Sequence, residues 1–305
     1  MSHIQQLFDI AAVEVARIRT GVVRLNGIPS GIGLERLVPS GIPRGKITAV
    51  YSSEGNFKTT LVTQLAIAAA TAGFRVLNLT LEDSAELVVH RYLARLTGVP
   101  FGVIHGGALT DEQRALVVAA EFGDVARRIF VVDDLDPYWA RAEAAVNALR
   151  MPNGKPGIDM VILDYVQMFG RDPKTLDDVV FGAQRFAKAN NVAIVFVSQQ
   201  VKPDTHDDNP RPKTENMFGS SALRMGCKLA IGLFRPWVLC KAPSSPKGPY
   251  GPYCKWLSSD PANVDIYPEL LEVHVTKNFA GPPGAYTVRV NPGTGIIEPY
   301  HLDFG

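Results

Sequence analysis

Lys58, Thr59 and Thr60 lie where a strand-like segment gives way to a helix-like one. Residues 46–51 read KITAVY and residues 58–71 are rich in Ala and Leu, with SSEGNF between them. A phosphate-binding loop has this context, because backbone N–H groups at a helix N-terminus bind anions. Lys58 would add a charge beside the β- and γ-phosphates, and Thr59 would offer its hydroxyl to Mg²⁺. We therefore predict that ATP, or another nucleoside triphosphate, is bound by Ser53, Glu54, Gly55, Asn56, Phe57, Lys58, Thr59 and Thr60.

This loop departs at two positions from the usual pattern G-x-x-x-x-G-K-[ST], since Ser52 stands at the first glycine and Phe57 at the second. We expect the loop to accept Phe57 if that residue keeps a negative φ. Some phage RecA-like ATPases are similar to this chain here, with the same Phe-Lys-Ser/Thr sequence. The alternative interpretation is a chance Lys-Thr-Thr at the start of a helix.

Polar residues also follow three apolar runs and could complete a hydrolytic site. Asp164 ends the run MVIL, where a carboxylate can hold a water of the Mg²⁺ shell, although it could instead cap a turn or helix. Glu82 follows FRVLNLTL and is the candidate base for the attacking water, while its neighbour Asp83 could cap the next helix. Gln199 follows VAIVFVS and could sense the γ-phosphate. We therefore expect Thr59 and Asp164 at the metal and Glu82 as the base.

The elements that must position these residues alternate between strand-like and helix-like patterns, which predicts a parallel sheet with helices on both faces. The expected strands are residues 46–51, 74–81, 128–134, 159–165 and 192–200. The expected helices are residues 58–71, 84–96 (capped by Ser84), a helix beginning with a Thr110–Gln113 capping box, 137–149 and 176–189. Strand-like runs at 228–234, 271–277, 285–290 and 295–300 have hairpin-like spacing and predict an antiparallel extension at one edge. We expect the insertion at 237–268, rich in Pro, Gly and Tyr, to be an ordered surface loop and a candidate partner site.

Composition limits the partners and the compartment. The chain has 305 residues, enough for one large α/β domain with a short appendage. Lys plus Arg number 31 against 30 Asp plus Glu, so any DNA binding must use a local patch. Cys227, Cys240 and Cys254 lack zinc-site spacing and suit a reducing compartment. The first ten residues do not resemble a signal peptide and no apolar run reaches the roughly 20 residues of a membrane span. We expect a cytoplasmic protein without membrane contact.

Residues 3–19 have apolar side chains at helical spacing: Ile4, Leu7, Phe8, Ala11, Val15 and Ile18. A Gly- and Pro-rich stretch follows at 21–45. This helix could pack on its own domain or on a neighbouring subunit. We therefore expect an N-terminal helix at 1–20 and an ATPase motor domain at 21–305.

Several motifs together resemble the DnaB-type replicative helicase family, over roughly residues 27–299. VILDYVQMF (161–169) is very similar to the family's Walker B strand, and RVLNLTLEDSAELVVHRYLARLTGV (75–99) resembles its catalytic-Glu strand and helix. VFVSQQ (195–200) resembles the sensor strand, and FGSSALRMGCKLAIGLFR (218–235) the DNA-facing loop, helix and strand. KNFAGPPG (277–284) resembles the family's Lys-x-Arg-x-Gly-Pro-x-Gly turn, with Phe279 in place of the trans-acting Arg. The order and spacing of these motifs agree with the family.

The resemblance implies a RecA-like P-loop NTPase fold, a hexameric ring with nucleotide at subunit interfaces, and single-stranded DNA in the channel. It further implies that residues 3–19 clasp the neighbouring subunit and that a primase or loader is a candidate partner. Lys277 is kept as a catalytic residue, and Arg235 aligns with the arginine finger of related phage ring helicases, although it could be a plain surface residue. The DNA-binding candidates are Lys202, Arg211, Lys213, Gly219, Ser220 and Ser221. We expect neither a separate N-terminal domain nor a primase in a chain of this length, and we expect a phage or plasmid origin, with residence in the bacterial host cytoplasm.

Three functions fit these motifs. The first is an ATP-driven helicase or translocase on single-stranded DNA in replication. The second is a RecA-like recombinase or accessory ATPase. The third is a nucleotide-binding ring with reduced turnover, because Phe57 and Phe279 replace residues that serve catalysis in the family.

Overall fold

The chain is seen here in a computed structural model that describes residues 27–121, 123–136, 138–154, 156–169, 173–200, 210–217, 221–241 and 250–301, together with Val15. The predicted N-terminal helix, apart from Val15, lies outside the described residues. So do Lys202, Gly219 and Ser220.

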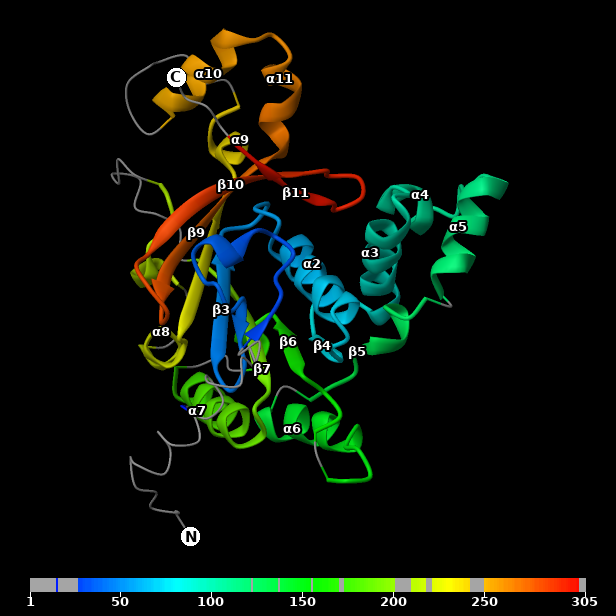
Figure 1. Ribbon diagram of the computed structural model, residues 1–305, viewed down its shortest axis with the longest axis vertical. Coiled ribbons are helices and arrows are strands. Elements are labelled where there is room, and N and C mark those ends of the chain that lie inside the picture. The colour runs from blue at the N-terminus through cyan, green and yellow to red at the C-terminus, as the bar shows by residue number, and fades with distance from the viewer. Residues whose placement is uncertain are drawn as a thin grey trace.

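A large mixed sheet runs through the molecule with strand order β11-β10-β9-β8-β3-β7-β6-β4-β5 (Figure 1). Its parallel part comprises β3 (Ile47–Ser52), β4 (Val76–Thr80), β5 (Ile129–Val132), β6 (Met160–Asp164), β7 (Ala193–Gln199) and β8 (Leu229–Phe234). The antiparallel part comprises β9 (Leu270–Asn278), β10 (Gly284–Val290) and β11 (Ile297–Tyr300). A small second sheet pairs β1 (Gly27–Ile28) with β2 (Ile42–Pro43). The predicted parallel sheet with an antiparallel extension is confirmed.

Helices cover both faces of this sheet. One face carries α2 (Lys58–Thr71) and α3 (Ala85–Thr97), with α4 (Phe101–His105) and α5 (Asp111–Glu121) packed beside α3. The other carries α6 (Trp139–Ala148), α7 (Pro173–Asn190) and α8 (Ser221–Gly226). Short 3₁₀ helices are η1 (Leu34–Arg36), η2 (Ala126–Arg128), η3 (Val166–Phe169), η4 (Thr214–Asn216) and η5 (Tyr267–Glu269).

Side-chain caps begin two of these helices where the sequence predicted them. The Ser84 hydroxyl accepts a hydrogen bond from the backbone N–H of Leu87 at 3.3 Å, so Ser84 caps α3. Thr110 and Gln113 exchange hydrogen bonds of 3.1 and 3.2 Å between side chain and backbone, which completes the capping box before α5.

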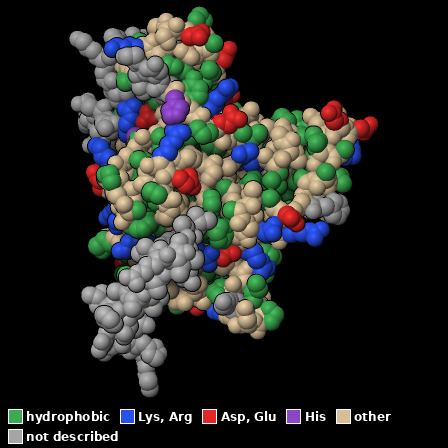
Figure 2. Space-filling model, in the orientation of Figure 1, with side chains coloured by type: hydrophobic (Ala, Val, Ile, Leu, Met, Phe, Trp, Pro, Cys, Tyr) green, Lys and Arg blue, Asp and Glu red, His purple; other side chains and the backbone are tan. Residues whose placement is uncertain are grey.

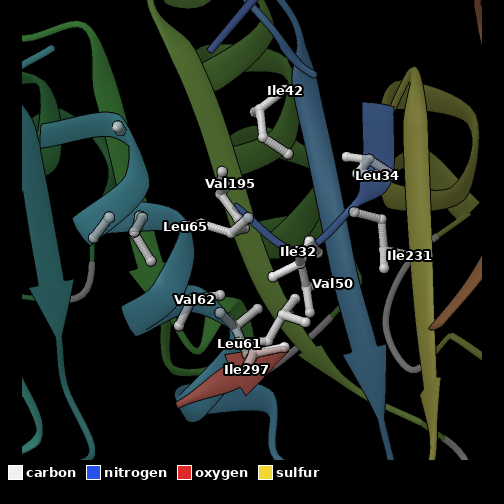
Figure 3. Packing of buried hydrophobic residues seen from close by; sticks show 14 of the residues in the cluster. Ile32, Leu34, Ile42, Val50, Leu61, Val62, Leu65, Val195, Ile231 and Ile297 are labelled. Carbon is white, nitrogen blue, oxygen red and sulfur yellow. The ribbon is translucent and has the colours of Figure 1, made fainter. Parts of the chain in front are cut away.

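Alternating side chains on the strands build two cores, one on each face of the sheet. On β7, Val195 and Val197 belong to the core under α2, whereas Ile194 and Phe196 belong to the core under α7. Figure 3 shows Leu61, Val62 and Leu65 of α2 directed towards Val50 and Val195. This two-sided burial holds the ends of the central strands in fixed relation to the start of α2.

The insertion at 237–268 is helical in the part that the structure describes, so its prediction as a loop was wrong. It contains α9 (Pro236–Leu239), α10 (Gly251–Ser259) and α11 (Asn263–Ile266), which project beyond one end of the sheet (Figure 1). Tyr253, Trp256, Tyr267 and Leu270 form a small core of their own there. The high Gly and Pro content concealed an aromatic cluster whose burial stabilises these short helices.

The described surface has no strong single-sign charge on the face in Figure 2, where basic and acidic side chains are interspersed. Within the same residues, no helix is both long and apolar enough to cross a membrane.

Candidate active site

The carboxyl ends of parallel strands β3, β4, β6 and β7 meet at a cleft of ≈ 380 Å³. Ligands bind at this end of parallel sheets, because loops and helix N-termini converge there. The lining residues are Glu54, Gly55, Asn56, Phe57, Lys58, Thr59, Thr60, Glu82, Arg91, Asp164, Tyr165 and Gln199. The structure thus brings together the predicted phosphate loop, base, acidic metal residue and sensor.

The phosphate loop contains a non-glycine residue in the left-handed region. Phe57, the residue before α2, has φ 59° and ψ 30°, so the negative φ on which we made acceptance of Phe57 depend is not found. A side chain in this conformation costs roughly 1–2 kcal/mol relative to an ordinary one. Gly55, two residues earlier, has φ 76° at no such cost. The loop therefore keeps the backbone turn that a glycine usually allows, and neighbouring contacts must offset the strain at Phe57.

Asn56 braces the loop from within. This buried side chain donates through Nδ2 to the carbonyl oxygens of Ser53 and Glu54, at 3.2 and 3.1 Å. Its Oδ1 accepts the backbone N–H of Arg235 at 2.7 Å. Asn56 therefore ties the loop to the segment that follows β8.

The Lys58 ammonium lies inside the loop. Its Nζ donates to the carbonyl oxygens of Ser52 and Ser53, at 2.9 and 3.0 Å. Burial lowers the pKa of Lys58, while the carboxylates of Asp164, Glu54 and Glu82 act to raise it. A phosphate group in the loop would add anionic partners that favour the charged lysine.

Thr59 and Asp164 fit a magnesium site. Burial raises the pKa of Asp164 to about 6, although a hydrogen bond from the Thr59 side chain opposes this shift. A divalent cation would stabilise the buried carboxylate, and both oxygens are ligand types that Mg²⁺ accepts. Among the described residues no group of three or more His, Cys, Asp and Glu could hold a metal.

Glu82 and Asp83 have different surroundings at the end of β4. Asp83 forms an ion pair with Arg91 of α3 at 3.2 Å, and its backbone N–H donates to the Thr80 hydroxyl at 3.3 Å. Glu82 is exposed and lines the cleft. A base needs access to the attacking water, so this geometry favours Glu82 over Asp83.

Gln199 lies between the phosphate loop and the segment that follows β7. The backbone N–H of the next residue, Gln200, donates to the Ser52 carbonyl at 2.9 Å, and Gln200 forms an isolated β-bridge with Met217. The backbone of Gln200 therefore links the strand end beside the cleft to Met217 in the segment 210–217.

Two residues lining the cleft were not predicted from the sequence. Arg91 lies eight positions after Asp83, which is slightly more than two helical turns, and its guanidinium carbon lies 5.1 Å from the centroid of the Phe101 ring. Tyr165 follows Asp164 directly, and burial raises its pKa. Two features of the sequence could have identified these residues: Tyr165 directly follows the candidate metal residue Asp164, and Arg91 lies on the helix that follows Glu82 and Asp83.

Arg211, one of the predicted DNA contacts, has a partner within the chain. Its Nε and Nη2 donate to the two carboxylate oxygens of Glu272 on β9, at 2.7 and 2.8 Å. Glu272 also accepts hydrogen bonds from Tyr253 and His274. Burial acts to raise the pKa of Glu272, but the hydrogen bonds from His274 and Arg211 hold it at about 2. Of the other DNA candidates, Lys213 precedes η4 and Ser221 is exposed at the start of α8.

Arg235, the candidate arginine finger, and Lys277, a candidate catalytic residue, both contact their own chain. The Arg235 guanidinium carbon lies 4.2 Å from the centroid of the Phe57 ring, so it covers the phosphate loop of the same chain. Lys277 Nζ donates to the carbonyl oxygens of Arg224 and Met225, at 2.8 and 3.2 Å, at the end of α8. Phe279 is exposed, with Lys46 Nζ 5.0 Å from its ring centroid.

A phosphate loop between β3 and α2, with Asp164 and Glu82 at the ends of adjacent strands β6 and β4, defines a RecA-like P-loop NTPase core. The family model described as DnaB-like helicase C terminal domain matches residues 27–294. The chain belongs to this family.

Relatives and solved structures agree with that membership. The replicative DNA helicase DnaB of Helicobacter pylori is 20% identical over 226 residues, covering 72% of this chain and 46% of the relative. A probable plasmid replicative DNA helicase of Chlamydia trachomatis is 26% identical over 200 residues, covering 64% and 44%. The chain thus spans less than half the length of these relatives.

Two solved structures have the same fold. One, described as an ATPase domain, has a TM-score of 0.79 at 16% identity, covering 98% of this chain and 100% of that one. A DnaB-like replicative helicase, solved in a study of its interactions with primase, has a TM-score of 0.76 at 15% identity, covering 97% and 67%.

Proposed function

We propose that this chain is the motor domain of a ring-forming DNA helicase that hydrolyses ATP to move along single-stranded DNA in replication. The observation that carries the proposal is the shared cleft of Lys58, Thr59, Glu82 and Asp164 within a helicase-family fold. The relatives named as replicative helicases support the same role.

The chemistry follows from the residues in the cleft. Lys58 and the N-terminus of α2 bind the phosphates, and Glu82 accepts a proton from the attacking water. Bound Mg²⁺ supplies positive charge beside the phosphate oxygens, and Thr59 and Asp164 are the residues that would hold it. Gln199 contacts the γ-phosphate and transmits its presence to the segment after β7.

DNA binding is local in this proposal. With nearly equal numbers of basic and acidic residues, the chain has no overall attraction to DNA. Lys202 and Lys213 add charge near the channel, and Gly219, Ser220 and Ser221 present backbone N–H groups to phosphates. A primase or loader is a candidate partner, since one structural neighbour was solved with its primase interactions in view.

Ring assembly uses the N-terminal helix of one subunit against the next. An apolar groove of ≈ 400 Å³, here called the α3–α5 groove, is lined by Val89, Tyr92, Leu93, Leu96, Val117, Val118, Ala126, Ile129 and Val131. Val15, the described residue of the N-terminal apolar stripe, is helical and 45% exposed, so its own chain does not bury it. We assign the groove to residues 3–19 of a second copy.

A RecA-like recombination or repair ATPase is the second candidate. It is favoured by the likeness to the DNA repair and recombination protein RadB of Methanosphaera stadtmanae, which is 23% identical over 191 residues. A nucleotide-binding ring with reduced turnover is the third, because Phe57 strains the phosphate loop.

The test is ATP hydrolysis by the full chain with and without single-stranded DNA, together with unwinding of a forked duplex. Lys58→Ala should abolish hydrolysis, whereas Lys188→Ala, an exposed lysine on α7, should leave it unchanged. Hydrolysis without unwinding, combined with strand exchange, would favour the recombinase. Nucleotide binding without turnover would favour the third candidate, and an active Lys58→Ala variant would remove the phosphate-loop assignment.

A further inference from the structure

The strained residue of the phosphate loop is covered by one arginine. The Arg235 guanidinium lies over two aromatic rings, with its central carbon 4.2 Å from the centroid of Phe57 and 5.1 Å from that of Trp237. Because a guanidinium is planar and weakly hydrated, it stacks on aromatic faces without losing its hydrogen bonds at the edge.

The nitrogen atoms of the same guanidinium donate hydrogen bonds to two backbone carbonyl groups. Nε and Nη2 donate to the carbonyl oxygen of Pro268, at 2.9 and 2.6 Å. Nη1 donates to the carbonyl oxygen of Gly55 at 3.4 Å. Arg235 therefore joins the phosphate loop to the last turn of the helical insertion, where Pro268 lies in η5.

Asn56 and Val238 add two further contacts between the same segments. The Arg235 backbone N–H donates to Asn56 Oδ1 at 2.7 Å. A Cβ at Gly55 would lie 3.7 Å from the Val238 side chain, so the start of the insertion packs directly on the loop. The residues just before Phe57 are thus held by elements that lie about 180 positions away in sequence.

We propose that Arg235 is a positioning residue that acts within its own subunit, holding the phosphate loop in its nucleotide-binding shape through Phe57 and Gly55. This inference rests on the proposed ATPase function. The chain replaces the usual glycine by Phe57, and Arg235 with Trp237 supplies the contacts that keep the resulting left-handed turn. The helical insertion is coupled to the nucleotide site by the same contacts.

The loss of a positioning residue and the loss of an arginine finger would change different kinetic constants. A finger acts on the transition state across an interface, so its loss lowers kcat and leaves nucleotide affinity intact. A residue that shapes the loop affects the bound ground state, so its loss raises Kd and KM for the nucleotide. To reach a neighbouring subunit, Arg235 would have to give up both rings and the bonds to Pro268 and Gly55.

The test is a double-mutant cycle on the full chain, with Kd measured by titration of a fluorescent ADP analogue in Mg²⁺. Arg235→Ala should weaken binding roughly tenfold in the Phe57 background, since it removes the stacking and the bonded edge together. In the Phe57→Gly background the same change should cost about twofold or less, because glycine adopts the left-handed turn unaided. Arg235→Lys should not rescue binding, since a point charge cannot stack and bridge Gly55 and Pro268.

Arg289→Ala is the matched control, because Arg289 pairs with Glu269 beside Pro268 without contacting the loop, and it should leave affinity unchanged. Equal losses for Arg235→Ala in both backgrounds, or unchanged affinity with a large fall in kcat, overturn the inference. If the unaltered chain fails to bind the analogue, the proposed function itself fails.

Mixed assemblies give an independent test of action within the subunit. Subunits with Arg235→Ala are mixed with Glu82→Gln subunits, and subunit exchange is confirmed by fluorescence transfer between labelled copies. Action within one subunit predicts no activity beyond the sum of the two separate preparations. Recovery of hydrolysis on mixing overturns the inference, because an intact Glu82 and an intact Arg235 would then be combined across an interface.

Discussion

Glu82 and Asp83 are neighbouring carboxylates whose contacts separate their roles. Asp83 is held by Arg91, while Glu82 faces the cleft. Glu82→Gln should therefore bind nucleotide normally and lower turnover by roughly 10²–10⁴-fold, because an amide cannot accept the proton of the attacking water. Steady-state hydrolysis and nucleotide titration on the same preparation separate the two effects. Asp83→Asn is the matched variant and should keep turnover within a few-fold. The opposite pattern would transfer the role of base to Asp83.

Glu272 is a residue whose charge supports the fold rather than the reaction. Its pKa is held at about 2, so it contributes stability that is complete above about pH 4.5 and is lost as the pH falls towards 2. A shift of this size corresponds to about 3 kcal/mol at pH 7. Glu272→Gln should lower the free energy of unfolding at pH 7 by about that amount. Below pH 4.5, the difference in free energy of unfolding between the variant and the unaltered chain should become smaller.

Urea unfolding at several pH values measures this prediction. Glu112→Gln, an exposed glutamate on α5, is the control and should change the free energy of unfolding by less than about 0.5 kcal/mol. A constant gap between pH 7 and pH 3 would show that altered packing, and not the charge of Glu272, accounts for the effect.

The candidate site residues that the structure brings into one cleft have local signals in the sequence. Asp164 ends β6, Glu82 lies two residues after β4, and Lys58 begins the helix that follows β3; the ends of parallel strands converge in space. The partners of Arg211 and Arg235 could not be predicted in the same way. Glu272 and Gly55 lie 61 and 180 positions from those arginines, and only tertiary packing brings them together. The sign of φ at Phe57 was likewise set by the surrounding contacts, because intrinsic preference favours the opposite sign.

Among the elements, the segment after β7 is where we expect contact with DNA. Lys202, Arg211 and Lys213 belong to this segment, and Arg211 also pairs with Glu272. The double variant Lys202→Ala and Lys213→Ala should flatten the slope of log affinity against log salt by up to about 0.7 for each phosphate that is no longer neutralised. Fluorescence anisotropy of a labelled single-stranded oligonucleotide measures this slope. The double variant Lys188→Ala and Lys255→Ala is the control. Equal slopes in the unaltered chain and both double variants would show that Lys202 and Lys213 do not contact DNA phosphates.

Regular elements were predictable and the insertion was not, for a physical reason. Strands β3, β6 and β7 are buried on both faces, so their continuous apolar runs identify them. Helix α3 carries its own capping signal in Ser84. The insertion depends on Tyr253, Trp256 and Tyr267 packing together, and its helices are too short for periodicity to reveal them.

At the scale of the whole molecule, the described part of one chain brings together the candidate phosphate-loop, metal and base residues but leaves the α3–α5 groove open. Val118 is 52% exposed in that groove, and Val15 of the N-terminal stripe is 45% exposed. Apolar surface of this kind gains stability when a second copy covers it. We therefore expect the two exposed surfaces to complement each other between subunits.

The prediction that follows concerns assembly. Val118→Asp should raise the dissociation constant of the oligomer by roughly 30-fold or more, because an unpaired carboxylate would be buried against an apolar helix. Deletion of residues 1–20 should have a similar effect, and combining the two changes should add little, since both remove the same contact. Analytical ultracentrifugation over a range of concentrations measures the constants. Val264→Asp places the same charge on α11, at a side chain that is 60% exposed outside the groove, and should leave assembly intact. Additive effects of Val118→Asp and the deletion would mean that the N-terminal helix binds elsewhere, and a Val118→Asp protein that assembles normally would remove the groove from the subunit interface.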